Sequence, residues 1–182
     1  MEIIKVDIEG PLILKPAVYK DARGYFYESY NAKTLANMGF TEVFVQDNES
    51  LSSKGVVRGL HFQLPPFSQG KLVKVVMGSV YDVAVDLRKN SPTYGQWSAI
   101  ELSAENKLMF WIPAGFAHGF QSLEENTIFS YKCTNYYDKN SEASLLFNDP
   151  DIGINWPIAN TILAEKDLQA GLLNNFDSPF QL

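Results

Sequence analysis

"KLVKVVMGSVYDVAVDL" (residues 71–87) is the stretch of sequence that decides the fold class. Its second half alternates strictly, with Tyr81, Val83, Val85 and Leu87 on one face and Asp82, Ala84 and Asp86 on the other. A period of two is the pattern that a β-strand imposes on its side chains. The residues "MGS" between the two halves predict a hairpin turn that joins strands 71–76 and 80–87.

Further strand-like segments follow at regular spacing, separated by short groups of turn-forming residues. They are residues 97–102, 107–112, 120–123 and 127–134, with turns at "SAEN", "PAG" and "EEN". Only two segments read as helices, residues 31–40 and 164–173, and Asn31 is a good N-cap for the first. This pattern predicts an all-β fold, an antiparallel sandwich or barrel with a few short helices near the two ends. A length of 182 residues suits one domain, residues 1–182.

Composition and charge narrow the class of protein. The formal net charge of −6 and the lack of a basic run argue against nucleic-acid binding. The single cysteine, Cys133, has no partner for an internal disulfide and fits a reducing compartment. The first residues do not resemble a signal peptide, and no apolar run reaches membrane-spanning length. We therefore expect a cytoplasmic protein that binds any anionic ligand through a few local Arg and Lys side chains.

Polar residues crowd one strand-like region, "GVVRGLHFQ" (residues 55–63), and the strand that follows it. In a regular strand Leu60 and Phe62 face one way and His61 faces the other. Arg58 is then out of phase with His61, unless Gly59 allows a bulge that re-aims one of them. A lone histidine here would most simply bond a backbone carbonyl. Arg58, Gln63 and Lys71 close to His61 instead indicate a functional site.

Several classes of chemistry fit this set of residues poorly. Two histidines, no H-x-H pair and one cysteine disfavour a transition-metal site, although a carboxylate-rich site stays open. No G-x-S-x-G motif is present, and Cys133 lies in an apolar strand where packing is its simplest role. His118, in the tight loop expected at "PAGFAHGF", serves either a loop hydrogen bond or a ligand.

Proton transfer fits better. A histidine can act as a general base near neutral pH, and a nearby lysine ammonium can stabilise an oxyanion, which would suit His61 and Lys71. A tyrosine could return the proton, and Tyr131 lies in phase with Phe129 and Cys133 on its strand. Taken alone, Tyr131 reads as a packed core residue with a bonded hydroxyl.

Taken together, the motifs resemble those of the dTDP-4-dehydrorhamnose 3,5-epimerases over nearly the whole chain. The motifs, in order, are "DARGYFYES", "QDNES", "GVVRGLHFQ", "QGKLVKVVMGSVYDVAVDLRKNSPTYGQW", "ELSAENK", "WIPAGFAHGF", "SYKCTNYYDK" and "NDPDIGINWP". The resemblance implies a jelly roll of the cupin type, a homodimer, and no metal or organic cofactor. It also implies inversion of C3 and C5 of dTDP-4-keto-6-deoxy-glucose, whose protons next to the C4 ketone are acidic, to give dTDP-4-keto-rhamnose.

The resemblance also implies roles for individual residues. His61 would be the base, Asp167 its dyad partner, Lys71 the group that stabilises the enolate oxygen, and Tyr131 the acid on the opposite face. Arg58 and His118 would line the sugar and phosphate region. The nucleotide would be held by Arg23, Phe26, Glu28, Gln46 and Asn48, partly from the partner subunit through an exchanged N-terminal strand.

Two positions depart from the family pattern. Glu49 stands where a histidine often follows "QDN", and an acid near a nucleotide is unhelpful unless it faces solvent. Ala164 replaces a serine that commonly caps the last helix, at a cost of about 1 kcal/mol.

Two alternative functions stay open from sequence. An enzyme that inverts only C3 or only C5 of a related sugar would use the same residues. A catalytically idle jelly roll that binds a nucleotide sugar would be expected to lose His61, Lys71 or Tyr131, and all three are present. A sugar 3,4-ketoisomerase would be expected to carry a second histidine close after the first, where this chain has Phe62 and Gln63.

Overall fold

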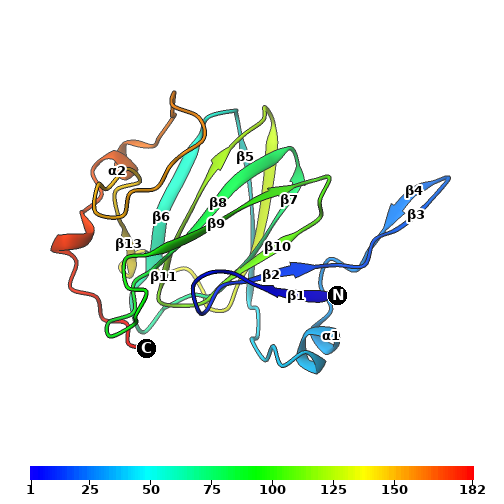
Figure 1. Cartoon of the computed structure of the whole chain (residues 1–182), viewed down its shortest axis with the longest axis horizontal. Helices are drawn as coiled ribbons and strands as arrows, with labels where there is room; N and C mark the ends of the chain where they lie inside the picture. Colours follow the sequence, from blue (N-terminus) through cyan, green and yellow to red (C-terminus); the bar gives the residue numbers. More distant parts are fainter.

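The computed structural model describes residues 1–182 and contains two antiparallel sheets that pack face to face (Figure 1). The six-stranded sheet has the order β1 (Glu2–Lys5), β2 (Leu12–Lys15), β10 (Met109–Ile112), β7 (Lys71–Met77), β12 (Thr127–Cys133), β5 (Gln46–Ser52). The five-stranded sheet has the order β13 (Glu142–Ser144), β6 (Val57–Gln63), β11 (Phe116–Ser122), β8 (Ser79–Asp86), β9 (Trp97–Ser103). A two-stranded ribbon, β3 (Tyr19–Asp21) and β4 (Gly24–Phe26), projects from the two sheets. This arrangement confirms the predicted all-β jelly roll.

Between β5 and β13 the chain crosses from one sheet to the other at seven connections, which is the connectivity of a jelly roll. Strands β7, β10 and β12 belong to one sheet, whereas β8, β9 and β11 belong to the other. The predicted hairpin between residues 71–76 and 80–87 is therefore wrong. A turn does occur, with Gly78 at φ 78°, but it carries the chain from one sheet to the other. Alternation along a strand defines its two faces, and it does not reveal which strand lies beside it.

The core has three parts, and two of them lie on opposite faces of the five-stranded sheet. Between the sheets, Val73, Ala84, Phe110, Phe120 and Phe129 pack together with other apolar side chains. On the outer face, Leu60, Phe62, Val83, Val85 and Leu87 pack against the C-terminal segment through Ile152, Ile154, Leu173 and Phe180. The two faces of β8 are those that the alternating pattern predicts. Its polar face, which carries Asp82, points into the space between the sheets.

The third part of the core lies on the outer face of the six-stranded sheet. There Leu35 of α1 (Ala32–Asn37) packs with Leu14, Leu72, Met109 and Trp111. The predicted N-cap is confirmed, because Asn31 Oδ1 accepts a hydrogen bond from Thr34 N at 3.1 Å. No helix is long and apolar enough to cross a membrane.

The second predicted helix is much shorter than residues 164–173. Helix α2 covers only Glu165–Leu168, and Ala164 makes no side-chain cap, as the missing serine predicts. The chain leaves the helix because its backbone finds other partners. The Gly171 carbonyl accepts from Leu146 N at 2.8 Å, and Leu173 N donates to Asp149 Oδ2 at 2.6 Å. A 3-10 turn, η1 (Leu173–Asn175), follows.

Histidine 118 lies in a strand, so its predicted place in a tight loop is wrong. The turn at residues 113–115 is present, but β11 begins at Phe116, four residues earlier than predicted. Gly119 allows this close pairing, because a Cβ there would come within 3.1 Å of the Arg58 carbonyl and the Gly59 Cα on β6. The structure thereby places His118 directly opposite His61 in the ladder.

Candidate active site

A cavity of about 500 Å³ opens between the two sheets at the end where their facing side chains are polar. Its charged and titratable lining residues are Arg58, His61, Lys71, His118, Tyr131, Glu142, Lys166 and Asp167. A neighbouring pocket of about 240 Å³ shares His61, Lys71, Tyr131 and Glu142 with it and adds Gln46 and Asn48. The two are lobes of one cleft, and eight of the eleven residues expected from sequence and resemblance line it.

A bulge in β6 brings Arg58 and His61 to the same cavity. His61 is opposite His118 and Arg58 is opposite Phe120, so β6 contains one residue more than β11 over this stretch. Gly59 makes the bulge possible, because its φ is 143° and a Cβ there would lie 2.4 Å from the Gly119 Cα. The predicted bulge at Gly59 is confirmed.

His61 and Asp167 form a close pair. The His61 Nε2 atom lies 2.7 Å from Asp167 Oδ1. The side chain of Asp167 is 3% exposed and that of His61 is 26% exposed. Because an ionised carboxylate only accepts hydrogen bonds, a neutral His61 carries its proton on Nε2 and keeps the lone pair of Nδ1 for another proton. The pair has the geometry of a general base held by a carboxylate.

Lys71 is half-buried and brings its ammonium to the cleft from the start of β7. It makes no salt bridge, although it lines both lobes. Burial lowers the pKa of Lys71, and the charges of Cys133, Asp82 and Glu142 partly oppose this shift. Negative charge that develops on a bound ligand would restore the preference for the ammonium, which is the property of an oxyanion-stabilising group.

Tyr131 points into the cleft from β12. Its strand neighbours Phe129 and Cys133 share the inward face, as the sequence pattern predicts, and are both buried. Burial raises the pKa of Tyr131, with the nearby Cys133 adding to the effect and Arg58 opposing it. The phenol is therefore protonated at neutral pH, as a proton donor must be.

Similarity to known proteins covers the whole of this architecture. The family model described as dTDP-4-dehydrorhamnose 3,5-epimerase matches residues 5–175. The chain is 54% identical over 176 residues to the dTDP-4-dehydrorhamnose 3,5-epimerase of Salmonella typhimurium, with 96% of each chain covered. The chain belongs to this family.

Solved structures of the epimerase family share the fold. A dTDP-6-deoxy-D-glucose-3,5-epimerase from Legionella pneumophila, solved with dTDP-4-keto-L-rhamnose, matches with a TM-score of 0.95 at 49% identity and covers 100% of this chain and 98% of its own. The Elizabethkingia anophelis dTDP-4-dehydrorhamnose 3,5-epimerase matches with a TM-score of 0.91 at 50% identity, covering 96% and 97%. The family resemblance inferred from the motifs is thus confirmed.

Strand β5 presents polar side chains to the second lobe of this epimerase-family cleft. Gln46 and Asn48 line it and are linked by a hydrogen bond of 3.0 Å. Ser50 lines the first lobe, and its Oγ is the one buried side-chain polar atom without a hydrogen-bond partner. Glu49 lies on the opposite, exposed face of the strand. The departure from the family pattern at this position therefore leaves the cleft unaffected.

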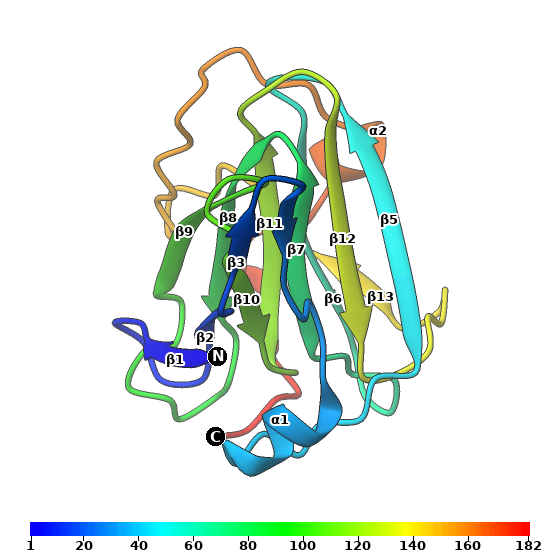
Figure 2. The same cartoon turned by 90° about the vertical axis from the view of Figure 1, so that its right-hand side faces the viewer.

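Three residues that the epimerase family implies for nucleotide binding lie outside the cleft. Arg23 and Phe26 sit on the β3–β4 ribbon, which projects away from both sheets in Figure 1 and points toward the viewer, in front of the sheets, in Figure 2. The Arg23 side chain is 90% exposed and pairs with Asp21, and Phe26 is 68% exposed. Glu28 accepts a hydrogen bond from Asn31 at the start of α1. Within one chain the structure does not bring these residues to the cleft.

Sequence reasoning missed three charged residues at or behind the cleft. Glu142 of β13 accepts hydrogen bonds from Lys166 Nζ at 2.5 Å and from the Tyr137 hydroxyl at 2.9 Å. The Lys166 bond holds the pKa of Glu142 below its usual value. Asp82 lies behind the cleft wall. Only Asp82 had a signal in the sequence, as a charged residue on the same strand face as Ala84, which packs between the sheets.

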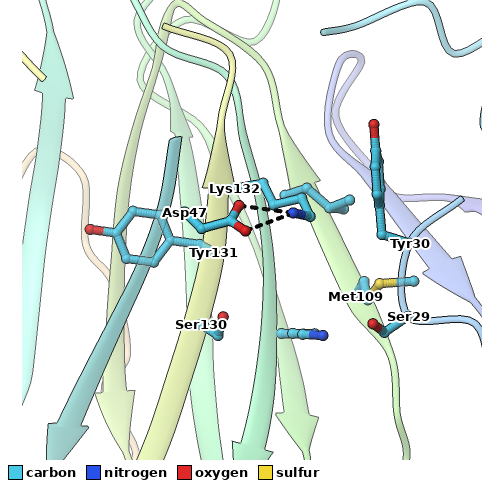
Figure 3. A pocket seen from close by; sticks show the side chains of 9 residues that line it. Ser29, Tyr30, Asp47, Met109, Ser130, Tyr131 and Lys132 are labelled. Atoms are coloured by element: carbon cyan, nitrogen blue, oxygen red, sulfur yellow. Dashed lines mark hydrogen bonds and ion pairs between the residues drawn. The ribbon is translucent and has the colours of Figure 1, made fainter. Parts of the chain in front are cut away.

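A smaller cavity of about 250 Å³ lies on the other side of the six-stranded sheet (Figure 3). Ser130 and Lys132 line it from β12, and Lys132 bonds both carboxylate oxygens of Asp47 at 2.8 and 2.9 Å. Figure 3 shows the Tyr131 ring leaving the strand on the side away from Lys132. His61 and Lys71 take no part in this cavity, so it is the cleft between the sheets that brings them together with Tyr131.

Proposed function

We propose that this protein inverts C3 and C5 of dTDP-4-dehydro-6-deoxy-D-glucose and forms dTDP-4-dehydro-L-rhamnose without a cofactor, as a step of dTDP-rhamnose biosynthesis. The observation that carries the proposal is the single cleft in which His61 with Asp167, Lys71 and Tyr131 converge. These are a base, an unpaired ammonium and a protonated phenol. They are the three groups that inversion next to a ketone requires.

The first step removes a proton. His61 takes the proton from the carbon next to the C4 ketone, and the C–H electron pair moves to form an enolate whose charge rests on the C4 oxygen. Asp167 stabilises the imidazolium that forms, since it lies 2.7 Å from the ring nitrogen. Lys71 stabilises the enolate oxygen with its ammonium.

The second step returns a proton to the other face of the same carbon. Tyr131 donates its phenolic proton, and the enolate collapses back to the ketone with the configuration inverted. An unperturbed tyrosine has a pKa of about 10, and a stronger base such as an enolate can take its proton. Water then returns a proton to Tyr131 and removes one from His61, and the cycle repeats at the second carbon.

The nucleotide end of the substrate is held by side chains of two chains in this proposal. Arg58 binds the phosphates, and Gln46 and Asn48 bind from the second lobe. Arg23, Phe26 and Glu28 come from the projecting ribbon and its flank in a second copy of the chain, so that the active form is a homodimer. The high exposure of Arg23 and Phe26 supports this part, because an exposed aromatic ring and guanidinium suit a base and a diphosphate.

We place the reaction in the cytoplasm. Cys133 is a free, buried thiol, which fits a reducing compartment.

The test is deuterium incorporation. The protein is incubated with dTDP-4-keto-6-deoxy-glucose in D₂O, and C3 and C5 are followed by NMR. We expect label and inverted configuration at both carbons. Label at one carbon only would identify an enzyme that inverts a single centre. Tight binding without any label would identify a non-catalytic nucleotide-sugar-binding protein.

A further inference from the structure

A second histidine–carboxylate pair is built into the wall of the cleft, with its histidine at the cavity and its carboxylate behind it. The Nε2 atom of His118 lies 3.0 Å from each carboxylate oxygen of Asp82. The side chain of His118 is 8% exposed and that of Asp82 is fully buried. His118 lines the cleft and Asp82 does not, so Asp82 reaches a ligand only through its neighbours.

The His118 ring is held on three sides. Asp82 lies on the neighbouring strand β8, where it faces Phe120 of β11. The ring of Phe129 stacks against the His118 ring, with the ring centres 6.0 Å apart and the planes 19° apart. On the third side His118 faces His61 across the β6–β11 ladder. The orientation of the His118 ring is therefore set by packing before any substrate enters.

The carboxylate also decides which nitrogen of His118 carries the proton. An ionised Asp82 can only accept, so neutral His118 has its hydrogen on Nε2 and a lone pair on Nδ1. No protein atom bonds Nδ1, and this atom is not among the buried polar atoms without a partner. Nδ1 is thus open to the cleft, where it can accept a hydrogen bond from a sugar hydroxyl.

Asp82 is a counter-charge for Lys71 as well. Burial lowers the pKa of Lys71, and Asp82 opposes this shift. Burial raises the pKa of Asp82, and His118 and Lys71 oppose that shift in turn. One buried carboxylate therefore stabilises the positive charge on Lys71 and orients His118.

We propose that Asp82 is a positioning residue of the epimerisation: it holds His118 with Nδ1 toward a hydroxyl of the sugar, and its charge keeps Lys71 protonated. The proposal rests on the reaction proposed above. The family resemblance gave His118 a place near the sugar and gave Asp82 no role. Asp82 acts entirely through Lys71 and His118, whose orientation and charge it sets.

The electrostatic setting is defined by the groups that face Lys71 and His118 from all the packed elements. They are Arg58 and His61 on β6, Asp82 on β8, Tyr131 and Cys133 on β12, Glu142 on β13, and Lys166 and Asp167 on α2. Among the carboxylates that act on Lys71, Asp82 has the larger effect and Glu142 the smaller.

The variant Asp82→Asn removes this charge and keeps the shape of the side chain. Loss of a negative charge lowers the pKa of Lys71, so activity falls at a lower pH as Lys71 loses its proton. We expect the alkaline limb of the kcat profile to move down by about one pH unit, a tenfold change in the protonation ratio. KM should change less than kcat, because the binding groups for the nucleotide stay in place.

Asp86→Asn is the matched control. Asp86 lies on the same strand, is equally buried, and bonds Arg88, Ser91 and Thr93 rather than the cleft. We expect this variant to lose stability and to keep the alkaline limb where it is in the unmodified protein. An equal shift in both variants would overturn the assignment, because it would make the effect a general one of losing a buried carboxylate.

A ¹H–¹⁵N NMR spectrum of the imidazoles tests the proposal independently of activity. The chain has only two histidines, and His61→Ala leaves the signal of His118 alone. We expect the Nε2–H tautomer of His118 in the protein with Asp82 in place, and a mixture of tautomers in Asp82→Asn. An Nδ1–H tautomer in the unmodified protein would overturn the proposal, even if Asp82→Asn does not fold. Absence of deuterium exchange with the expected tautomer would instead reject the proposed reaction.

Discussion

The two histidine–carboxylate pairs of the cleft differ in the way each is built. His61 is 26% exposed and takes its carboxylate from the four-residue helix α2, whereas His118 is 8% exposed and takes its carboxylate from β8, an interior strand of the five-stranded sheet. A base must reach a substrate and exchange its proton with water, so partial exposure suits His61. Burial lowers the pKa of His118 despite the nearby Asp82, which keeps its ring neutral and suited to orientation. The same two residue types can therefore serve proton transfer or positioning, according to their access to solvent.

The largest expected effect separates the two histidines. His61→Ala should lower the rate of deuterium exchange by about 10³-fold or more, because the general base is lost. His118→Ala should lower it by about tenfold, because one hydrogen bond to the substrate is worth about 1.5 kcal/mol. Exchange rates at C3 and C5, measured by NMR for both variants, test the difference. Equal losses would mean that both histidines act as bases.

The next effect separates removal of the proton from its return. Tyr131→Phe removes the phenolic proton and leaves His61, Asp167 and Lys71 in place. We expect exchange at C3 and C5 to continue, while formation of the inverted product falls by about 10²–10³-fold. Chiral analysis of the product beside the deuterium content provides the measurement. Unchanged inversion would remove Tyr131 from the role of acid.

Asp167→Asn tests the carboxylate that pairs with His61. The amide no longer stabilises the imidazolium of His61, so we expect kcat to fall by about a hundredfold with little change in KM. Gln169 is the C-cap residue of α2, so Gln169→Asn is the control for disturbance of this helix. It should leave kcat within about twofold. A fall limited to KM in Asp167→Asn would assign the carboxylate to binding.

Neither histidine–carboxylate pair is expected to bind the nucleotide. The β3–β4 ribbon, in contrast, is expected to affect nucleotide binding and not the chemical step. Phe26→Ala should raise KM by about tenfold and leave kcat unchanged, because a stacked base contributes about 1–3 kcal/mol. Tyr25 lies on the same ribbon, and its hydroxyl accepts a hydrogen bond from Lys107. Tyr25→Phe removes only this hydroxyl and should leave both constants unchanged. Initial rates over a range of substrate concentrations decide this point. A KM that stays constant in Phe26→Ala would remove the ribbon from the nucleotide site.

The pairing of His61 with Asp167 could be inferred from sequence only through resemblance, because the two residues lie 106 positions apart in the chain. Local pattern was sufficient for the two faces of β8, the cap at Asn31 and the bulge at Gly59. It failed for the turn at Gly78 and for the start of β11, since strand pairing depends on contacts far apart in the chain. It also overestimated the length of α2. That helix ends early because the backbone at Gly171 and Leu173 bonds instead to Leu146 and Asp149. Asp82 was visible as an acid on an inward face, but its partner His118 was not.

The smallest effect concerns the helix that carries Asp167. Ala164→Ser supplies the missing side-chain cap, and we expect the free energy of unfolding in urea to rise by about 0.5–1 kcal/mol. Ala164→Val supplies no hydroxyl and should give no gain. The contact of 2.7 Å between His61 and Asp167 is already formed in the structure, so kcat should change by less than about twofold. A large rise in kcat in Ala164→Ser would mean that α2 is usually unformed in solution. The activity of the His61–Asp167 pair would then be limited by the stability of the helix that carries Asp167.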